Sequence, residues 1–420
     1  MFGKSRPDVV VVGAGPVGLF SALSLAHRGL SVMIVDKDWR RAAHSYALGL
    51  HVKSLWLLRS LGLFEEIEKN GRKISKVEIY DPSEKRAEIQ IKDIDADMPF
   101  LITMEQAKLE EILESALNDR GIKVLWNHEV SHLEEKDDGV ELVIDRLEKI
   151  SLGYAIAHTE WVVAKSEKVK VPLVIGADGH RSFVRRSLQI PFEMVGQTQH
   201  FAVFEFKCRQ SRDYDMRLDL TPDTMNVLWP LPNQFCRWSF EVKDDLHDED
   251  SRQKERQAVS LSQSPFPILS MERFHQLLKE RASWFTAQPE QITWRIVVRF
   301  EKRLADRFGK GRVWLAGDAI HMTGPAGIQS MNIGFREAFM LAELAEAVIK
   351  KGASLNRFEE YHEQFIKEWR MINNLDARVK RGTNQDPWIA ENQERILPSL
   401  PASGNELIKM LNILGFEVLG

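Results

Sequence analysis

The stretch VVVVGAGPVGLFSALSLAHRGLSVMIVD, residues 9–36, predicts a strand, a tight turn, a helix and a second strand. Residues 9–12 are four consecutive valines, and such a run of β-branched residues is typical of a strand buried on both faces. Residues 16–28 follow helical spacing, and Gly29 is placed to end that helix. Residues 32–35 form a second apolar run, so the stretch predicts a β-α-β unit with a parallel sheet.

The turn of this unit carries the glycine pattern of a dinucleotide site. Gly13 allows the tight turn, Gly15 lets the backbone approach a pyrophosphate, and Gly18 lets helix and strand pack closely. Pro16 begins a helix whose N-terminal N–H groups attract phosphate. Asp36 ends the second strand, where a carboxylate accepts hydrogen bonds from an adenosine ribose and repels a 2′-phosphate. The pattern therefore predicts FAD or NAD rather than NADP, and it leaves those two open.

Two later segments carry a family resemblance. Residues 176–185 read GADGHRSFVR, and residues 317–321 read GDAIH, followed by Pro325, Gly327 and MNIG at 331–334. These segments resemble the DG and GD motifs of the para-hydroxybenzoate hydroxylase-like enzymes, the single-component FAD-dependent aromatic monooxygenases of class A. Together with the N-terminal glycines, the three motifs follow the order of that family.

The resemblance extends over about residues 8–375 and implies a function. It implies bound FAD, with NADH or NADPH as a transient co-substrate. The implied reaction is hydroxylation of a small aromatic or phenolic substrate, including a polycyclic one, by O₂ through a flavin C4a-hydroperoxide. Two alternatives stay open: a flavin-dependent reductase or dehydrogenase of the same superfamily, similar to the isoprenoid reductases, and a non-catalytic FAD-binding module.

The resemblance also implies roles for individual residues. Asp318 follows a buried strand, at the edge where α/β sheets bind ligands, and there it accepts from a ribityl hydroxyl of FAD. Pro325 lies beside the isoalloxazine ring and is our one candidate for the catalytic environment, while backbone N–H groups near Met331 and Asn332 donate to the ring. The predicted cofactor-binding residues are Gly13, Gly15, Pro16, Gly18, Asp36, Lys37, Arg41, Gln106, Asp178, Gly317, Asp318, Pro325, Gly327, Met331 and Asn332.

The sequence departs from the family near the flavin. Tyr46 stands where the family usually has an arginine that contacts FAD, and a neutral phenol cannot replace a guanidinium against phosphate. Arg40 and Arg41, in the preceding loop, are the alternatives. Ile328 and Ser330 stand where glycines are common, which predicts a tighter space beside the ring.

The candidate substrate-binding residues are aromatic. They come from the middle of the chain, where alternating apolar residues predict a second, antiparallel sheet. An aromatic residue at such a position is more often part of the core than in contact with a substrate. The candidates are Tyr214, Trp229, Phe235 and Trp238.

The expected fold class is α/β, a Rossmann-like FAD-binding domain with an inserted antiparallel-sheet substrate domain and C-terminal helices. We expect the FAD-binding domain at 1–75, 100–185 and 300–350, the substrate-binding domain at 76–99 and 186–299, and a helical region at 351–420.

Three local helix predictions accompany this division. Residues 101–117 are expected to be a helix opened by Thr103, and helical spacing continues over 355–378. Ser403 and Glu406 fit a capping box before a short helix.

Composition limits the function classes. The 420 residues include 57 Lys and Arg against 61 Asp and Glu, a net charge of −4, which argues against a nucleic-acid binder. Two cysteines, Cys208 and Cys236, cannot form a disulfide framework or a four-cysteine metal site, and we expect no metal. Neither a signal peptide nor a membrane span is expected, so the sequence favours a cytoplasmic protein, as a monomer or a homodimer.

Overall fold

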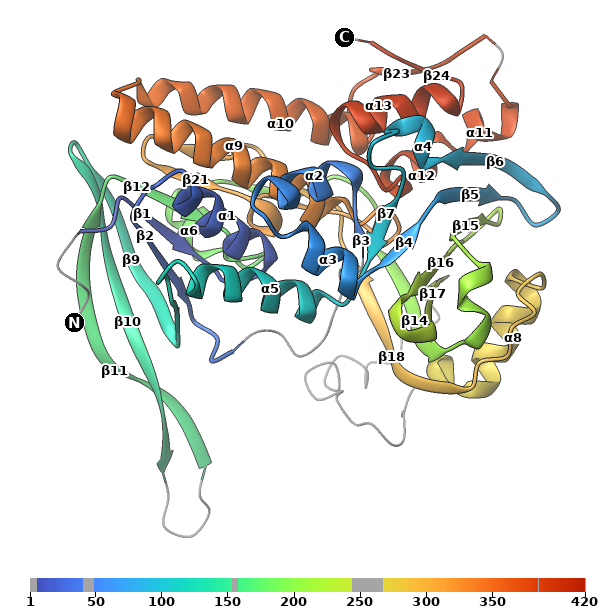
Figure 1. Cartoon of the computed structure of the whole chain (residues 1–420), viewed down its shortest axis with the longest axis horizontal. Coiled ribbons are helices and arrows are strands. Elements are labelled where there is room, and N and C mark those ends of the chain that lie inside the picture. The colour runs from blue at the N-terminus through green and yellow to red at the C-terminus, as the bar shows by residue number, and fades with distance from the viewer. Residues whose placement is uncertain (1–5, 41–48, 153–157, 244–266, 384, 420) are drawn as a thin grey trace.

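A mainly parallel sheet of six strands, from distant parts of the chain, forms the centre of one half of the molecule (Figure 1). The computed structural model describes residues 6–40, 49–152, 158–243, 267–383 and 385–419. The strand order is β20-β21-β12-β1-β2-β8, and every pair is parallel except β20 with β21. The strands are β1 (Val9–Val12), β2 (Val32–Asp36), β8 (Val124–Trp126), β12 (Leu173–Gly176), β20 (Gly309–Lys310) and β21 (Val313–Leu315).

The register of this sheet brings three distant motifs together. Val12 pairs with Gly176 and with Val35, and Gly176 pairs with Leu315. Because parallel strands end at the same edge, the segments that follow β1, β12 and β21 emerge side by side. This edge is where the glycine pattern, the DG motif and the GD motif meet.

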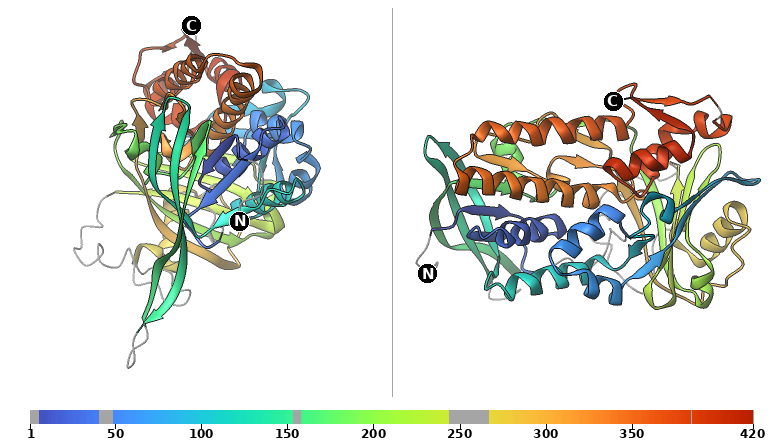
Figure 2. Two further views of the ribbon diagram at one scale, coloured as in Figure 1. Left: turned by 90° about the vertical axis from the view of Figure 1, so that its left-hand side faces the viewer. Right: turned by 45° about the horizontal axis from the view of Figure 1, so that its top comes forward.

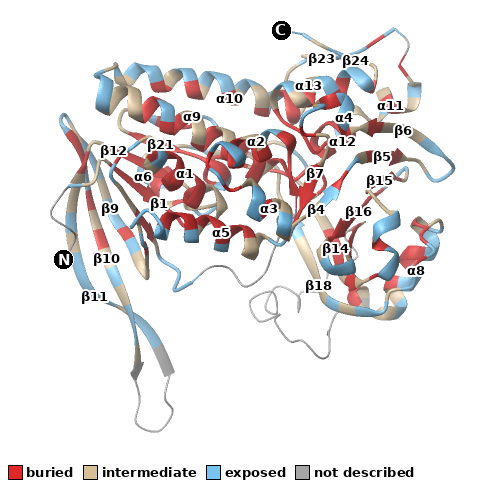
Figure 3. Ribbon diagram, in the orientation of Figure 1, coloured by how far each residue is buried: buried red, intermediate tan, exposed pale blue. Residues whose placement is uncertain are grey.

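Helices cover one face of the sheet, and a β-meander lies on the other side (Figures 1 and 2). Gly29, at a φ of +70°, ends α1 as expected. Figure 3 shows that buried residues concentrate where α1, α9 and the parallel strands meet. The helices here are α1 (Pro16–His27), α2 (Val52–Ser60), α3 (Phe64–Asn70), α5 (Gln106–Asn118), α6 (Phe183–Ser187) and α9 (Gln329–Lys351); the meander is β9 (His128–Lys136), β10 (Gly139–Leu152) and β11 (His158–Val171).

A second sheet lies at the end of the molecule opposite the meander (Figures 1 and 2). Its order is β18-β14-β17-β16-β15-β5-β6, and all neighbours are antiparallel except β15 with β5. One face joins the main hydrophobic core, and the other packs on α8 (Met271–Arg281) in a separate aromatic cluster. The strands are β5 (Lys76–Tyr80), β6 (Lys85–Gln90), β14 (Gln199–Lys207), β15 (Met216–Leu220), β16 (Met225–Leu231), β17 (Phe235–Val242) and β18 (Gln291–Phe300).

Smaller elements connect these layers. A three-stranded sheet in the order β3-β7-β4 joins the helices to the second sheet. The C-terminal region is mainly helical, with α10 packed against α9. These elements are β3 (Gly49–Leu50), β4 (Arg72–Ile74), β7 (Leu101–Thr103), β13 (Phe192–Met194), β19 (Arg303–Ala305), β22 (His321–Met322), β23 (Val379–Arg381), β24 (Phe416–Val418), α4 (Ile91–Ile94), α10 (Phe358–Ile372), α11 (Pro387–Glu391), α12 (Gln393–Ile396) and α13 (Gly404–Ile413). The predicted α/β fold class, with a parallel sheet, a second and mainly antiparallel sheet and C-terminal helices, is confirmed.

Three local predictions were wrong. Thr103 lies in strand β7, where its hydroxyl donates to the carbonyl of Pro230 at 2.7 Å, and the helix begins only at Gln106. Helix α10 ends at Ile372, because Asn374 takes a left-handed φ of 54°. Ser403 precedes α13, but its side chain makes no capping hydrogen bond. For Thr103 the partners are tertiary, because β7 pairs with β3 and β4 and thereby replaces the local helical pattern.

None of the helices in the described part of the chain is both long and apolar enough to cross a bilayer.

Candidate functional site

The three glycines of the first turn have different surroundings. A Cβ on Gly13, at φ +104°, would lie 2.3 Å from the carbonyl oxygen of Ala177, and one on Gly18 would lie 1.9 Å from that of Gly13. A Cβ on Gly15 would meet no atom within 4 Å. Gly13 and Gly18 therefore allow close packing within the protein, whereas Gly15 faces open space.

The first turn of α1 is open to an anion. Gly15 is its N-cap, no side chain caps it, and it contains no acidic residue. Pro16 is the first helical residue, which removes one N–H donor and pre-sets the backbone. The remaining N–H groups have no side-chain acceptor, so they can bind phosphate.

Asp36 borders the same turn. Its carboxylate accepts from the N–H of Ala14 at 2.6 Å and from that of Asp38 at 2.8 Å. Burial raises the pKa of Asp36, against these hydrogen bonds and the nearby charge of Lys37, whose own side chain is exposed. The carboxylate is thus held in place at the end of β2.

Two of the predicted positions cannot be placed. Arg41 and Tyr46 lie outside the described residues. Arg40 is described, and its guanidinium lies 4.1 Å from the ring centroid of Trp39, which is exposed. Gln106 begins α5 and donates to Glu110 at 2.8 Å.

Asp178 organises the DG segment. Its Oδ2 atom accepts from the N–H groups of Phe183 at 2.7 Å and Val184 at 3.1 Å, at the start of α6. Its Oδ1 atom is buried and has no partner in the described part of the protein. Burial raises the pKa of Asp178. The same carboxylate therefore caps a helix and keeps one acceptor unused.

Arg185 joins the DG and GD segments. It is 6% exposed, and its guanidinium donates to the carbonyls of Ala319 at 2.6 Å and His180 at 2.9 Å. It also lies 4.0 Å from the ring centroid of Phe192. These contacts make Arg185 a link between the two segments.

Asp318, at the same edge, is open to solvent. Its side chain is exposed, and its carboxylate makes no hydrogen bond within the described ranges. The surrounding protein displaces water and raises the pKa of Asp318, an effect that His321 and His180 partly offset. A hydroxyl arriving from solvent can therefore donate to this carboxylate.

A buried network lies behind Asp318. Glu337 and His321 are both fully buried, and the Nε2 atom of His321 lies 2.9 Å from a carboxylate oxygen of Glu337. The same oxygen accepts from the N–H of Gly317 at 2.9 Å. Trp369 donates to the other oxygen at 3.1 Å and stacks on the His321 ring at 4.0 Å. His321 is therefore part of the support for the GD loop.

The side chain of Asn332 clamps the other wall of the site. Its oxygen accepts from the N–H of His51 at 2.8 Å and the hydroxyl of Ser54 at 2.7 Å. Its amide donates to the carbonyls of Gly49 at 2.9 Å and Ile328 at 2.7 Å. This clamp fixes β3 and α2 against the start of α9.

The loop before α9 is held by a hydrogen bond from His51 and by close packing at Gly327. The Nε2 atom of His51 donates to the carbonyl of Gly327 at 2.8 Å, and burial lowers the pKa of His51 to about 3, so the ring is neutral. A Cβ on Gly327 would lie 2.6 Å from the carbonyl oxygen of Pro398. Pro325 is half-buried in this loop, and Met331 is buried in the first turn of α9.

The start of α9 carries an unusual residue. Ile328 is the N-cap in the left-handed region, at φ 50° and ψ 38°, which is strained for a β-branched side chain. Its Cδ1 atom would lie 3.0 Å from a Cβ on Gly49. The first turn of α9 has no side-chain cap and no acidic residue. Its N–H groups and partial positive charge are therefore available to an electron-rich group.

The four candidate substrate residues divide between the two faces of the second sheet. Trp229 and Phe235 lie on the face that joins the main core, and Trp229 also lies next to Gly49 of β3. Tyr214 and Trp238 lie in the cluster on α8, where both contact Trp284. Because side chains alternate along a strand, neighbouring aromatic residues in β16 and β17 point to opposite sides.

The sequence analysis did not identify an ion pair on the inner face. Arg237 is 4% exposed and donates to Glu205 at 2.6 Å, directly across from it on β14. Its guanidinium lies 4.8 Å from the ring centroid of Trp294, and burial lowers the pKa of Arg237. An arginine at an inward position of an alternating strand was the available signal.

The first comparison with known proteins is a protein-family model whose match includes all three motifs. The model of the family described as "FAD binding domain" matches residues 6–368. A 6-methylpretetramide 4-monooxygenase of Streptomyces rimosus is 27% identical over 349 residues, which cover 81% of this chain and 56% of that protein. A 3-(3-hydroxy-phenyl)propionate/3-hydroxycinnamic acid hydroxylase of Escherichia coli K12 is 25% identical over 359 residues, covering 85% and 59%. The chain thus spans a little over half the length of these two curated relatives.

Among solved structures, the p-nitrophenol 4-monooxygenase of Pseudomonas putida superposes with a TM-score of 0.73 at 22% identity. The match covers 98% of this chain and 99% of that one, which shows a shared fold.

The geometry fits the cofactor of this family. Gly15 faces open space, the first turns of α1 and α9 are uncapped, and the Asp318 carboxylate is open at the same sheet edge. With a family model that spans 6–368 of its 420 residues, this chain belongs to the FAD-binding domain family.

Proposed function

We propose that this protein is an FAD-dependent monooxygenase that hydroxylates an aromatic or phenolic substrate with NADH or NADPH and O₂. The observation that carries the proposal is the open carboxylate of Asp318 beside the uncapped N-terminus of α9. A group that binds there has one polar acceptor and one cluster of N–H donors, at the edge where the three motifs meet.

The chain offers a place for each part of FAD. The first turn of α1, with Gly15 and Pro16, would hold the pyrophosphate, and Asp36 would accept from the adenosine ribose. Asp318 would accept from the ribityl chain. The N–H groups at the start of α9, near Met331 and Asn332, would face the electron-rich edge of the flavin.

The remaining cofactor contacts of the proposal involve α5, β2 and the two later motifs. Gln106 and Lys37 lie near the ends of α5 and β2 and would reach the phosphates or the ribose. Asp178 and Gly317 would shape the DG and GD loops around the cofactor. Arg41 belongs to the same proposal from its sequence position alone.

Bound FAD would supply the oxidation–reduction chemistry, which comprises hydride transfer from the nicotinamide and activation of O₂. The protein must position the aromatic ring and exclude water. Pro325 and Gly327 would line the ring, with Ile328 narrowing the space against Gly49 and Trp229. Trp229 and Phe235, on the inner face of the second sheet, would form the opposite wall.

We propose the domain division that follows from this site. Residues 76–99 and 186–299 would form the substrate-binding part, since their strands make up the second sheet. Cys208 and Cys236 are buried free thiols, which suits a reducing compartment such as the cytoplasm.

Labelling with ¹⁸O₂ tests the proposed function. The FAD-loaded protein is given NADH or NADPH, ¹⁸O₂ and a panel of phenols, and products are analysed by mass spectrometry. The proposal expects one ¹⁸O atom per product molecule, with nicotinamide consumption that depends on the phenol. Reduction of a double bond without ¹⁸O would establish the reductase alternative. FAD binding with no substrate-dependent consumption of nicotinamide would favour a non-catalytic module.

A further inference from the structure

The sequence contains two cysteines, Cys208 and Cys236, and the fold brings them together. Phe206 of β14 pairs with Cys236 of β17, and the N–H of Cys208 donates to the carbonyl of Gln234 at 2.6 Å. Cys208 therefore lies diagonally opposite Cys236 on the same face of the second sheet. Both are free, fully buried thiols in the aromatic cluster on α8, so strand pairing places them next to each other there.

The two thiols act on each other. A hydrogen bond from the Cys236 thiol lowers the pKa of Cys208, and the same contact raises the pKa of Cys236. The backbone N–H of Gln210, in the 3₁₀ helix η1 (Arg209–Asp213), also lowers the pKa of Cys208, while burial and two nearby acidic side chains oppose it. The thiolate is the reactive form of cysteine, so Cys208 is the nucleophile of the pair and Cys236 is its donor.

Arg72 supplies a positive charge beside the pair. Its guanidinium donates to the carbonyl of Tyr214 at 2.8 Å and to the hydroxyl of Ser211 at 3.4 Å. Its Nε atom is buried and has no partner in the described part of the chain. Cys208 and burial raise the pKa of Cys236, and the charge of Arg72 opposes them. A guanidinium in this place favours the loss of a proton from the thiol pair.

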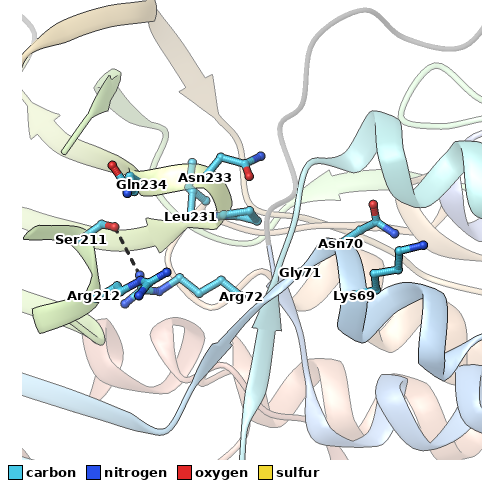
Figure 4. Close-up of a pocket in the computed structure, with 10 residues that line it drawn as sticks. Lys69, Asn70, Gly71, Arg72, Ser211, Arg212, Leu231, Asn233 and Gln234 are labelled. Carbon is cyan, nitrogen blue, oxygen red and sulfur yellow. Dashed lines mark hydrogen bonds between the residues drawn. The ribbon is translucent and has the colours of Figure 1, made fainter. Parts of the chain in front are cut away.

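A cavity of about 500 Å³ lies next to the thiol pair (Figure 4). Among the residues that line it are Arg72, Ser211, Arg212 and Gln234. Gln234 carries the carbonyl that is bonded to Cys208, and Arg72 is the cation that acts on Cys236. The cavity therefore reaches an immediate neighbour of each cysteine. A solute as small as hydrogen peroxide fits into such a volume, whereas the full burial of both thiols excludes a bulky reagent.

We propose that Cys208 and Cys236 form a reversible disulfide within the chain when hydrogen peroxide enters this cavity. The Cys208 thiolate attacks one oxygen of the peroxide, so that an S–O bond forms and the O–O bond breaks. The hydroxide that leaves takes up the proton that Cys208 released and becomes water. Cys236 then attacks the sulfur of the resulting sulfenic acid, an S–S bond forms, the S–O bond breaks, and a second water leaves with the proton of Cys236. The peroxide gains two electrons, one from each thiol.

This modification site goes beyond the function proposed above and does not depend on it. A single exchangeable pair is not a disulfide framework, and disulfides of reducing compartments are characteristically transient. The bond would tie the end of β14 to the start of β17 and fix the first residue before η1. Because η1 carries Ser211 and Arg212, one wall of the cavity would then depend on the oxidation state of the two thiols.

The experiment treats the full, folded chain with hydrogen peroxide and, in parallel, with glutathione disulfide as a bulky oxidant. Each sample is quenched in denaturant with a maleimide, and mass spectrometry of the intact chain and of its peptides counts free thiols and cross-links. The variants are Cys208→Ser, Cys236→Ser and Arg72→Gln. Arg212→Gln is the matched control, because Arg212 lines the same cavity but has an exposed side chain.

We expect peroxide to remove both free thiols, to make the chain lighter by two hydrogen atoms and to yield one cross-linked peptide pair, all reversed by dithiothreitol. Glutathione disulfide should react about tenfold more slowly or less. The oxidised chain should melt a few degrees above the reduced one, a shift that both single-cysteine variants lack. Arg72→Gln should slow disulfide formation several-fold, while Arg212→Gln keeps the wild-type rate. If Arg72→Gln does not fold, the two serine variants still test the pair.

Two free thiols that persist in the folded chain after peroxide treatment overturn the proposal. So does a cross-link between two chains, or oxidation of Cys208 to a sulfinic acid while Cys236 stays free, because either result shows that the two sulfur atoms do not meet. An unchanged rate in Arg72→Gln contradicts the part assigned to that arginine. None of these outcomes bears on ¹⁸O incorporation, so this proposal and the monooxygenase function fail or hold separately.

Discussion

The Nε2 atom of His321 lies 2.9 Å from a carboxylate oxygen of Glu337, and both side chains are fully buried. That oxygen also accepts from the N–H of Gly317, and Trp369 donates to the other oxygen. Two helices, α9 and α10, thereby fix the loop that presents Asp318. The loop of the candidate cofactor site is therefore held by the buried carboxylate of Glu337, which contacts three hydrogen-bond donors.

Glu337→Ala is expected to lower the free energy of unfolding by about 3 kcal/mol, because three buried donors lose their acceptor. Urea denaturation measures this. Glu343→Ala is the control on the same helix, since Glu343 is half exposed and pairs with Arg28 at the surface, so its loss should stay below about 1 kcal/mol. Equal effects of the two variants would contradict the role of the network.

Asp318→Ala is expected to weaken FAD binding about tenfold, since it removes an open acceptor without breaking a hydrogen bond within the protein. Fluorescence titration with FAD measures the Kd, and thermal melting of the apoprotein should be nearly unchanged. Asp306→Ala, at an exposed aspartate, is the control. An unaltered Kd in Asp318→Ala would remove Asp318 from the cofactor site.

Gly15→Val and Gly18→Val should fail in different ways. A side chain at Gly15 meets open space, so that variant should fold but not bind FAD. A Cβ at Gly18 would overlap the carbonyl oxygen of Gly13, so that variant should lose folded protein. Circular dichroism and the flavin absorbance of the purified proteins decide this, and a flavin-loaded Gly15→Val protein would disprove the pyrophosphate assignment.

The free energy of unfolding is expected to fall as the pH rises, because Asp219 loses its proton. Burial raises the pKa of Asp219 to about 6 from 3.8, although Arg217 donates to it at 2.9 Å. The folded protein therefore binds this proton more tightly than the unfolded chain does. Its contribution to stability is fully present below about pH 4 and is lost as the pH rises through about 6.

The expected loss between pH 5 and 7.5 is about 1 to 2 kcal/mol. Comparing urea unfolding of the wild type with that of Asp219→Asn isolates this contribution, because the variant has no carboxyl to titrate. The same pH slope in both proteins would show that Asp219 is not the group responsible.

Substitutions of Trp229 and Trp238 should affect different quantities, the KM in the first case and the stability of the fold in the second. Trp229→Phe alters the inner face next to Gly49, and we expect it to change the KM for the aromatic substrate several-fold. Trp238→Phe alters the cluster on α8, and we expect a loss of about 1 to 2 kcal/mol in stability with little change in KM. Steady-state kinetics and thermal melting of the pair provide the test. A larger KM effect from Trp238→Phe would reverse the assignment of the two faces.

Local sequence determined the first β-α-β unit, because valine runs, a glycine turn and Gly29 act over a few residues. The glycine pattern at Gly13 was identified from its own sequence context, and the motifs with Asp178 and Asp318 were identified from a family resemblance; in the structure each of the three follows a buried strand.

Only the tertiary structure decided which side chains meet. The contacts of Asn332 with Gly49 and of Thr103 with Pro230 join segments far apart in the chain. The faces of Trp229 and Trp238, and the approach of Arg72 to Arg212, depend on strand register and on the packing of one sheet against another. Periodicity shows that a side chain is turned inward, but the partner it finds there is set by the long-range pairing of strands and helices.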